Sequence, residues 1–506
     1  MLKKILVVLA SMILLFTGCG EKNGAKKVKE ELIIAQDGES KSLDIHQGND
    51  GFSLRANRLI YSRLVEADEN MQIHPGLAES WQQLDDKTMQ FKLRKGIKFH
   101  NGDDFTAEDV KFSFERMMNS PRIAFVLPPI ERIDIVDDYT VNIVTKTPFG
   151  PLLAHLSHPA LGMVSKKLLT ENPEALKEKP IGAGSYKFKE WIYGDKLVLE
   201  KNEDFYDKNE RGLKYIIFKN VVEASNRAIG LETGEIDIAT PISSVDEENI
   251  KNNPKLQLLT KPSISYSYIG MNMTKAPLND IRVRKAINYA IDKQAIIDVI
   301  LNENGKIATS PIAPGVFGFT DKTKNYEYNV EKAKELMKEA GYENGFTTSI
   351  LVFSGEANTQ TAEIVQAYLK EIGIDVAVET LEWGAYLDGT ARGDHDMFML
   401  GWVTVTGDAD YGLFPLLHTS SFGGAGNRAF YSNPHVDELL SKARVSIDQD
   451  ERKELYREVQ IIAQEEVPYY VTAYKAQNAA LQKNIENFKL KPAGHHRLYG
   501  VKFKEN

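Results

Sequence analysis

The chain has 506 residues, which is enough for roughly two to four domains. Hydrophobic residues make up 42% and charged residues 26%, a composition typical of globular proteins and not of disordered ones. The formal net charge is −9 and no basic stripe follows the N-terminus, which argues against a nucleic-acid partner because its phosphates would be repelled.

The N-terminus has the pattern of a secretory signal. Lys3 and Lys4 precede an apolar run, Ile5 to Phe16, that is shorter than the roughly 20 residues of a membrane-spanning helix. The only cysteine, Cys19, ends a run from Leu15 that resembles a bacterial lipobox. The resemblance implies cleavage before Cys19 and lipid attachment to its sulfur, which would hold the protein on a membrane. The rival interpretation is ordinary signal cleavage that leaves a free thiol.

The first elements after this segment are predicted from their apolar spacing. Leu32 to Ala35 indicates a short strand, and Gln36 to Phe52, rich in Gly, Ser, Asn and Asp, indicates a loop. Leu54 to Val65 carries Leu, Ile and Tyr at helical spacing and predicts a helix.

The most informative stretch runs from Leu93 to Met118 and predicts a strand, a tight turn and a helix. Apolar residues alternate with Lys and Arg up to Asn101-Gly102, where both residues tolerate positive φ. Thr106 is the expected N-cap, with Asp109 three residues later in a variant of the capping box. The buried face of the helix is expected at Val110, Phe114 and Met117.

Leu93 to Val110 resembles the signature Leu-Arg-x-Gly-x-x-Phe-x-x-Gly-x-x-Phe/Val-Thr-Ala-x-Asp-Val of the family 5 extracellular solute-binding proteins, the dipeptide- and oligopeptide-binding components of ABC importers. Pro75 to Trp81 and Pro277 to Ile287 resemble further family motifs. The resemblance implies an α/β fold like that of type II periplasmic binding proteins, with two lobes joined by a hinge and an extra subdomain, three domains in all. It also implies an ABC permease and ATPase as partners, and we expect a monomer.

The resemblance and the order of elements divide the chain into a lipoprotein signal peptide at 1–18, a tether at 19–30, domain I at 31–70, 181–265 and 481–506, domain II at 71–180, and domain III at 266–480. Strands flank Asp137-Asp138 as a predicted hairpin. Strand and helix alternate over 197–237 and over 350–379, which indicates α/β units. Further helices are expected at 331–340, 437–446 and 450–467.

The predicted ligand site centres on Met397 to Tyr431, where an apolar run ends at Gly401-Trp402 and a polar, Gly-rich loop follows. In peptide-binding relatives, a Trp here is followed three residues later by an Asp that pairs with the peptide's α-ammonium. This chain has Val405 at that position. Either Asp408 or Asp410 takes over the amine, or the ligand has no free α-amine at that point.

Other candidates surround this loop. Arg392 and Arg428 could bind a carboxylate, because a guanidinium can donate two hydrogen bonds to that group. Arg428 could equally belong to an ordinary surface ion pair. Trp383 and Trp402 could stack on a ligand or wall the cleft. The candidate ligand-binding residues are Trp402, Asp408, Asp410, Arg428, Asn427, Trp383, Arg392 and Asp50.

The signal segment and the resemblance to the family together imply an exported, lipid-anchored receptor at the outer face of the cytoplasmic membrane that carries short peptides to a permease. The alternative is the same architecture with glutathione, a nickel complex, haem or an oligosaccharide as ligand. A secreted hydrolase is disfavoured, because the sequence has no Gly-x-Ser-x-Gly, no His-Glu-x-x-His and no second cysteine. His155-x-x-His158 and His495-His496 do not reach the ligand count of a metal site, and no cofactor is expected.

Overall fold

The computed structural model describes residues 29–504, apart from 49, 209–211, 302–303 and 499. The predicted signal peptide and the predicted lipidation site at Cys19 lie outside the described residues. Within the described ranges, no helix combines the length and the apolar character that crossing a membrane requires.

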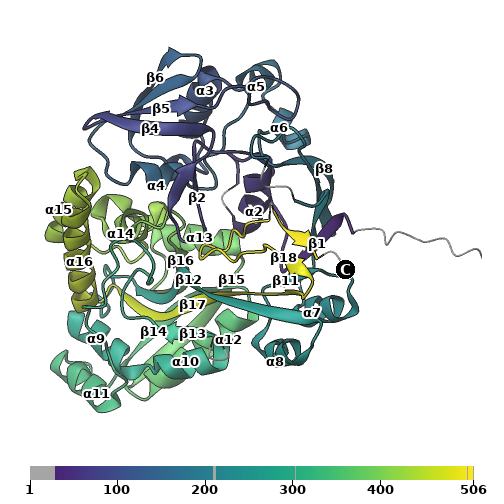
Figure 1. The fold of residues 1–506 in the computed structure, drawn as a ribbon. Coiled ribbons are helices and arrows are strands. Elements are labelled where there is room, and N and C mark those ends of the chain that lie inside the picture. Colours follow the sequence, from purple (N-terminus) through teal and green to yellow (C-terminus); the bar gives the residue numbers. More distant parts are fainter. Residues whose placement is uncertain (1–28, 49, 209–211, 302–303, 499, 505–506) are drawn as a thin grey trace, which may run out of the picture.

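A large mixed sheet runs through the middle of the molecule (Figure 1). In spatial order its strands are β15 (Ile374–Leu381), β14 (Phe346–Phe353), β16 (Met397–Val403), β12 (Leu256–Met271), β17 (Tyr469–Gln482), β11 (Ile238–Thr240), β1 (Glu31–Gln36), β10 (Tyr215–Asn220), β9 (Lys196–Lys201) and β8 (Tyr186–Ile192), with β13 (Gly305–Ile307) beside β17. β1 is parallel to β10 and β11, and β14 is parallel to β15 and β16. Parallel neighbours need crossover connections, which helices supply at both ends of the sheet.

The strands β12 and β17 join the two ends of this sheet. The first part of β12, up to Pro262, pairs with the part of β17 that also touches β11, whereas the part from Ser265 onward pairs with both β17 and β16. The β12–β17 pairing is irregular between Pro262 and Tyr266 and again between Ser267 and Tyr268. A proline has no N–H for the ladder, so Pro262 donates no ladder hydrogen bond where the two halves of the sheet meet.

We follow the predicted boundaries and call residues 29–265 and 481–504 lobe one, and residues 266–480 lobe two. The helices of lobe one are α2 (Gly51–Ile60), α3 (Ala107–Met118), α4 (Leu152–Leu156), α5 (Lys166–Glu171), α6 (Ala175–Glu178), α7 (Ala224–Thr233) and α8 (Ser244–Asn252). Those of lobe two are α9 (Ile281–Ala290), α10 (Lys293–Ile300), α11 (Val330–Glu339), α12 (Glu356–Lys370), α13 (Trp383–Arg392), α14 (Ala409–Leu417), α15 (Pro434–Val445) and α16 (Gln449–Glu466). Short 3₁₀ helices are η1 (Ala124–Val126), η2 (Thr419–Ser421) and η3 (Gly423–Ala425).

A separate antiparallel sheet lies at the top of Figure 1 and belongs to lobe one. In spatial order its strands are β4 (Ala78–Asp85), β5 (Thr88–Leu93), β7 (Thr140–Thr145) and β6 (Ile130–Asp137). The predicted hairpin around Asp137-Asp138 is confirmed as the β6–β7 turn. The predicted capping box is also confirmed, because the Thr106 N–H donates to the Asp109 carboxylate at 2.9 Å. Phe114 and Met117 are fully buried against this sheet, at about 1.5–3 kcal/mol for each such side chain.

The helix predicted over 54–65 is displaced. α2 begins at Gly51, after its N-cap Asp50, and ends at Ile60, and the hairpin of β2 (Val65–Ala67) and β3 (Ile73–Pro75) follows. The apolar run does continue, but the carbonyls of Arg63 and Leu64 accept hydrogen bonds from the backbone of residues 76–78. These hydrogen bonds hold Arg63 and Leu64 outside the helix.

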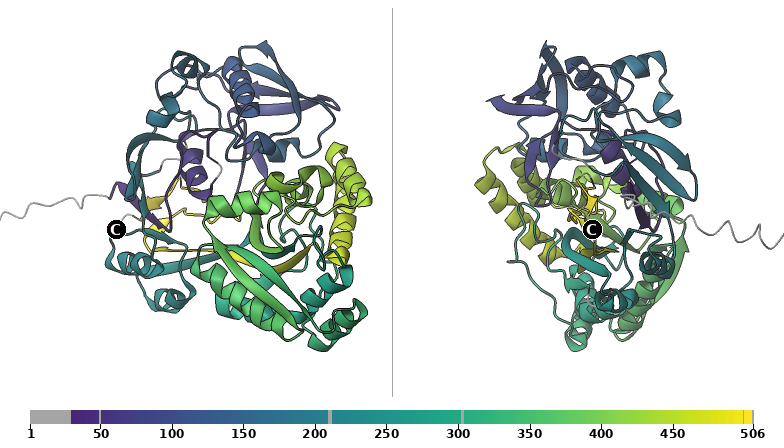
Figure 2. Two further views of the ribbon diagram at one scale, coloured as in Figure 1. Left: turned by 180° about the vertical axis from the view of Figure 1, so that it is seen from behind. Right: turned by 45° about the vertical axis from the view of Figure 1, so that its right-hand side comes forward.

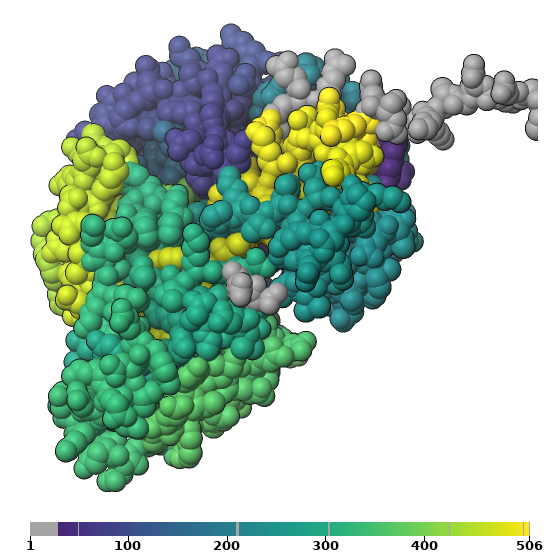
Figure 3. Space-filling model, turned by 60° about the horizontal axis from the view of Figure 1, so that its bottom comes forward, coloured from purple at the N-terminus to yellow at the C-terminus, as the bar shows by residue number. Residues whose placement is uncertain are grey.

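The C-terminal segment returns to lobe one. A small hairpin of β18 (Ile485–Glu486) and β19 (Lys502–Phe503) closes it, and Phe488, Leu490 and Leu498 join the core that contains Leu32 of β1. In Figure 3 this yellow segment lies on the surface between the purple N-terminal part and the teal residues of lobe one. Figure 2 shows α15 and α16 of lobe two along one flank of the molecule.

Candidate functional site

The loop after β16 leads into the first turn of α14 and carries the central predicted residues. Asp408 is the N-cap of α14, and its carboxylate accepts the Asp410 N–H at 2.9 Å. Trp402 is half-buried, its indole Nε1–H donates to the Tyr411 carbonyl at 2.9 Å, and its ring centroid lies 5.5 Å from that of Tyr411. Trp402 is therefore fixed to the start of α14.

Asp408 pairs with an arginine. Both of its carboxylate oxygens accept from Arg452 Nη2, at 2.7 and 2.8 Å, and the Arg452 side chain is only 1% exposed. An ammonium group from a ligand would have to compete with this buried guanidinium. The predicted ammonium role of Asp408 therefore requires this pair to open.

Asp410 belongs to an ion-pair cluster that joins the lobes. Its fully buried carboxylate accepts from Arg444 Nε at 2.9 Å and from Arg444 Nη2 at 3.1 Å, and His155 Nε2 of lobe one lies 3.1 Å away. The other ring nitrogen of His155 lies 2.9 Å from the Val126 carbonyl. Burial would raise the pKa of Asp410, but Arg444 and His155 hold this pKa at about 2.

We call His155, Asp410 and Arg444 the clasp. The backbone reinforces it, because the Gly150 N–H of lobe one donates to the Arg444 carbonyl at 2.9 Å. A Cβ atom at Gly150 would lie 2.0 Å from the Ser446 carbonyl oxygen, so this approach depends on glycine. The clasp and this backbone hydrogen bond connect lobe one to lobe two.

A small cavity lies between the lobes beside Val405. Its volume is about 20 Å³, which is room for about one water molecule. Val405 of lobe two lines it from one side, and Met71, Arg58 and Arg63 of lobe one line it from the other. The lobes also touch next to this cavity, because a Cβ atom at Gly407 would lie 3.0 Å from Met71 Cβ.

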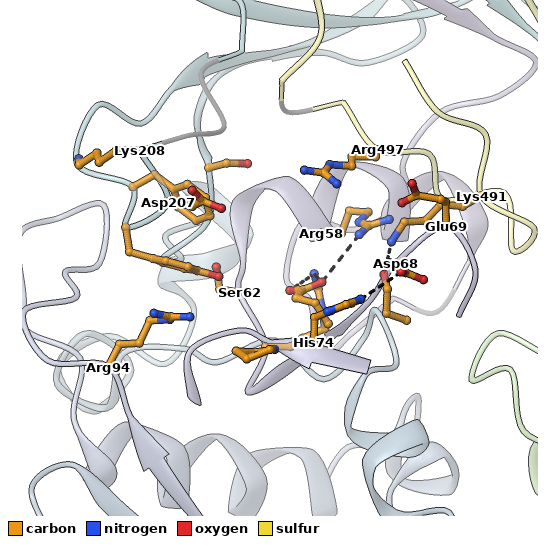
Figure 4. Close-up of a pocket in the computed structure, with 17 residues that line it drawn as sticks. Arg58, Ser62, Asp68, Glu69, His74, Arg94, Asp207, Lys208, Lys491 and Arg497 are labelled. Atoms are coloured by element: carbon orange, nitrogen blue, oxygen red, sulfur yellow. Dashed lines mark hydrogen bonds and ion pairs between the residues drawn. The ribbon is translucent and has the colours of Figure 1, made fainter. Parts of the chain in front are cut away.

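A larger cavity of about 710 Å³ lies within lobe one, and its size suits a small molecule (Figure 4). In Figure 4, Arg58, Lys491 and Arg497 lie on one side of it and Arg94 and Lys208 on the other. The two cavities share a wall made of Arg58, Arg63, Glu66, Ala67 and Lys491.

The electrostatics of this wall are dominated by cations. Burial would raise the pKa of Glu66, but Arg63 and Arg58 hold it below its ordinary value. Burial and the neighbouring Arg58 lower the pKa of Lys491 well below its ordinary value. The Glu66 shift reports the two neighbouring guanidinium groups, and the Lys491 shift reports mainly burial.

The remaining candidate residues lie away from the loop after β16 or make contacts within the protein. Asp50 is the N-cap of α2 and accepts from the Ser53 N–H at 2.9 Å. Trp383, 41% exposed, stacks on Tyr386 at 5.9 Å between centroids. Arg392 pairs with Asp394 at 2.7 Å on the surface.

Arg428 and Asn427 are buried. The interpretation of Arg428 as a surface ion pair is wrong, because its Nη1 donates to the Leu387 carbonyl at 2.8 Å and to the Thr390 hydroxyl at 2.6 Å. The Asn427 amide donates to the Tyr431 carbonyl at 2.8 Å and stabilises the turn between these two residues. The structure thus gathers Trp402, Asp408 and Asp410 at the start of α14, and their binding roles stay predictions.

The sequence reasoning missed the partners of these aspartates. His155 was noted only as half of a His-x-x-His pair, and nothing marked Arg444, Arg452 or Arg63. Among the described residues, no group of three or more His, Cys, Asp or Glu side chains is placed to hold a metal ion.

A sheet carried between two lobes by long strands, with an extra sheet on one lobe, is the mixed α/β fold of type II periplasmic binding proteins. The predicted fold class is confirmed by a close structural match. DppA of Helicobacter pylori, solved in complex with the peptide STSA, has a TM-score of 0.86 and 32% identity, covering 94% of this chain and 98% of that one.

The chain belongs to the bacterial extracellular solute-binding proteins of family 5, whose model (family 5 Middle) matches residues 72–424. It is 33% identical to the glutathione-binding protein GsiB of Pectobacterium atrosepticum, over 92% of each chain. It is 31% identical to heme-binding protein A of Haemophilus influenzae, over 88% of this chain and 87% of that one. The recognition of the family from Leu93 to Val110 is therefore confirmed.

Proposed function

We propose that this member of the ABC importer receptors captures short peptides between its lobes and delivers them to a membrane permease. The observation that carries the proposal is the clasp, because His155 and Asp410 join the lobes next to the half-buried Trp402 and the cavity at Val405. The likeness to DppA of Helicobacter pylori, solved with a peptide, supports peptide as the solute class.

The mechanism is binding and closure. A peptide enters while the lobes are apart and exchanges main-chain hydrogen bonds with strand ends and loops. Closure then brings His155 to Asp410 and the Gly150 N–H to the Arg444 carbonyl, at the distances found here. The closed form is the state that a permease has to recognise, since it differs from the open form in the relative position of the lobes.

We also propose that the mature protein is anchored by lipid on Cys19, at the outer face of the cytoplasmic membrane. The support is the lipobox-like run before that residue. Membrane fractionation of the wild type and Cys19→Ser tests this, with the wild type expected in the membrane pellet and the variant in the soluble fraction. Equal amounts of both proteins in the soluble fraction would contradict the anchor.

A second candidate is a related solute, with glutathione and haem placed ahead of a nickel complex or an oligosaccharide. Two observations favour it: Val405 replaces the ammonium-pairing aspartate, and two relatives are named for glutathione and haem.

Native mass spectrometry of the mature chain with a pool of di- to pentapeptides tests the proposed function. We expect one or a few peptides to be retained, and a tenfold excess of a captured peptide to compete with the pool. A chain that retains no peptide, but whose melting temperature rises with glutathione or haem, would move the assignment to the second candidate. A solute present at a hundred times its Kd stabilises the fold by about 2.7 kcal/mol, which a thermal melt detects.

A further inference from the structure

The tip of the β2–β3 hairpin in lobe one carries a residue in an unfavourable backbone conformation. Met71 has a φ of 63°, which lies in the left-handed region that residues with a side chain rarely adopt. A glycine would adopt the same conformation without this cost. A flexible apolar side chain at such a position calls for a compensating role, because strained residues gather where a site or a clamp needs them.

The turn itself does not need the Met71 side chain. The Asp68 carboxylate accepts the N–H groups of Asn70 at 2.7 Å and of Gln72 at 2.9 Å, and the Met71 N–H donates to the Asp68 carbonyl at 3.2 Å. From residues 70–72 these hydrogen bonds use only the backbone, so a glycine at position 71 would form the same turn. The compensation for the unfavourable φ has to come from contacts of the Met71 side chain.

The Met71 side chain contacts lobe two. It packs against the hydrophobic cluster of lobe two that contains Tyr266 and Leu413, and it lines the cavity opposite Val405. Gly407 lies next to it, because a Cβ atom at Gly407 would lie 3.0 Å from Met71 Cβ, 3.1 Å from its Cε and 3.3 Å from its Cγ. The backbone of lobe two therefore approaches this side chain closely, and a side chain at position 407 would push the two lobes apart.

Gly407 connects this contact to the loop of the candidate site. Its φ is 71°, its N–H donates to the Thr404 carbonyl at 2.8 Å, and its carbonyl accepts the Phe317 N–H at 2.8 Å. The cavity left beside Val405, about 20 Å³, admits about one water molecule, so Met71 and Val405 together fill this end. We propose that Met71 is a positioning residue of the solute site, which holds the loop after β16 against lobe one and closes the site at Val405. The inference rests on the proposed function and adds the residue of lobe one that closes this end of the site.

Three variants separate this role from a merely structural one. Met71→Gly removes the side chain and relieves the unfavourable φ, so its urea midpoint should equal or exceed that of the wild type, while its Kd for a peptide captured from the pool should rise about fivefold or more. Met71→Leu keeps an apolar side chain of similar volume and should bind within about twofold of the wild type. Asn487→Gly is the control, since it relieves a similar φ of 65° at an exposed residue, and it should leave the Kd unchanged.

A second readout needs no solute. Amide hydrogen exchange of residues 404–407 in the solute-free chain should be about fivefold faster in Met71→Gly than in the wild type and unchanged in Met71→Leu, because the same contact holds the loop. Wild-type affinity or wild-type exchange in Met71→Gly would overturn the inference, and so would a loss of affinity that comes with a lower urea midpoint. Faster exchange in Met71→Gly, with no peptide retained by the wild type, would support the positioning role and count against the proposed function alone.

Discussion

Removal of His155 from the clasp should open the lobes. The structure gives this side chain a contact to Asp410 across the lobes, at 3.1 Å, and a contact to Val126 inside lobe one, at 2.9 Å. On opening, the contact to Asp410 and the ring contact to Tyr411 of lobe two change. His155→Ala therefore removes one buried, charge-assisted hydrogen bond from the closed form, at about 1.5–3 kcal/mol.

That loss shifts the equilibrium between the open and closed forms by roughly 10- to 100-fold, since each 1.4 kcal/mol is a factor of ten. The affinity for a captured solute falls by up to the same factor, because binding then has to supply the energy of closure. Asp410 keeps Arg444 in both forms, so the fold itself should tolerate the change.

The assay is fluorescence transfer between dyes at exposed positions of the two lobes, Glu131→Cys in lobe one and Lys334→Cys in lobe two. His435→Ala is the matched control, since His435 contacts Glu458 at the same 3.1 Å but on the surface and within lobe two. A His155→Ala variant whose closed fraction matches that of His435→Ala would refute the reasoning.

Three further results are expected. Gly150→Ala should weaken solute binding at least tenfold by calorimetry, because its Cβ atom meets a carbonyl oxygen 2.0 Å away. Gly384→Ala is the control, since its Cβ atom meets open space, and it should bind solute like the wild type. Equal affinities of the two variants would contradict a role of Gly150 in closure. Asp109→Ala should destabilise the fold by about 1–2 kcal/mol in urea unfolding, by removing hydrogen bonds to the Thr106 and Lys166 N–H groups; an unchanged midpoint would exclude a capping role. The fold lowers the pKa of the Asp410 carboxyl from 3.8 to about 2, so the stabilisation that the ionised carboxylate gives to the fold is present above about pH 4 and is lost as the pH falls through 2. The difference in free energy of unfolding between the wild type and Asp410→Asn should therefore shrink by about 2 kcal/mol between pH 5 and 2. A difference that stays constant would contradict the lowered pKa.

The sequence predicted those features of the fold that depend on residues close together in the chain. The capping box of α3 connects residues three positions apart, and the hairpin at Asp137-Asp138 connects adjacent strands, so both are visible in the sequence. The end of α2 was wrong because hydrogen bonds from residues 76–78 terminate the helix. Such pairing leaves no mark in the apolar spacing of residues 54–65.

The candidate site likewise has features that the sequence predicted and features that it did not. The loop carrying Trp402 and Val405 was predicted from its composition and its resemblance to a family. Val405 lines a cavity that residues of lobe one also line, and the binding role of the loop stays a prediction. The partners of its aspartates lie 34, 44 and 255 residues away along the chain, at Arg444, Arg452 and His155. No spacing rule connects residues so distant, and their charges become meaningful only once the fold places them.

Hydrogen–deuterium exchange of the wild type, with and without a peptide captured from the pool, tests most directly whether the solute lies between the lobes. The account predicts that amides around Trp402 to Asp410 and around His155 gain protection together, because closure buries both. Protection confined to residues 205–208, at the larger cavity of lobe one, would place the solute elsewhere and contradict the account.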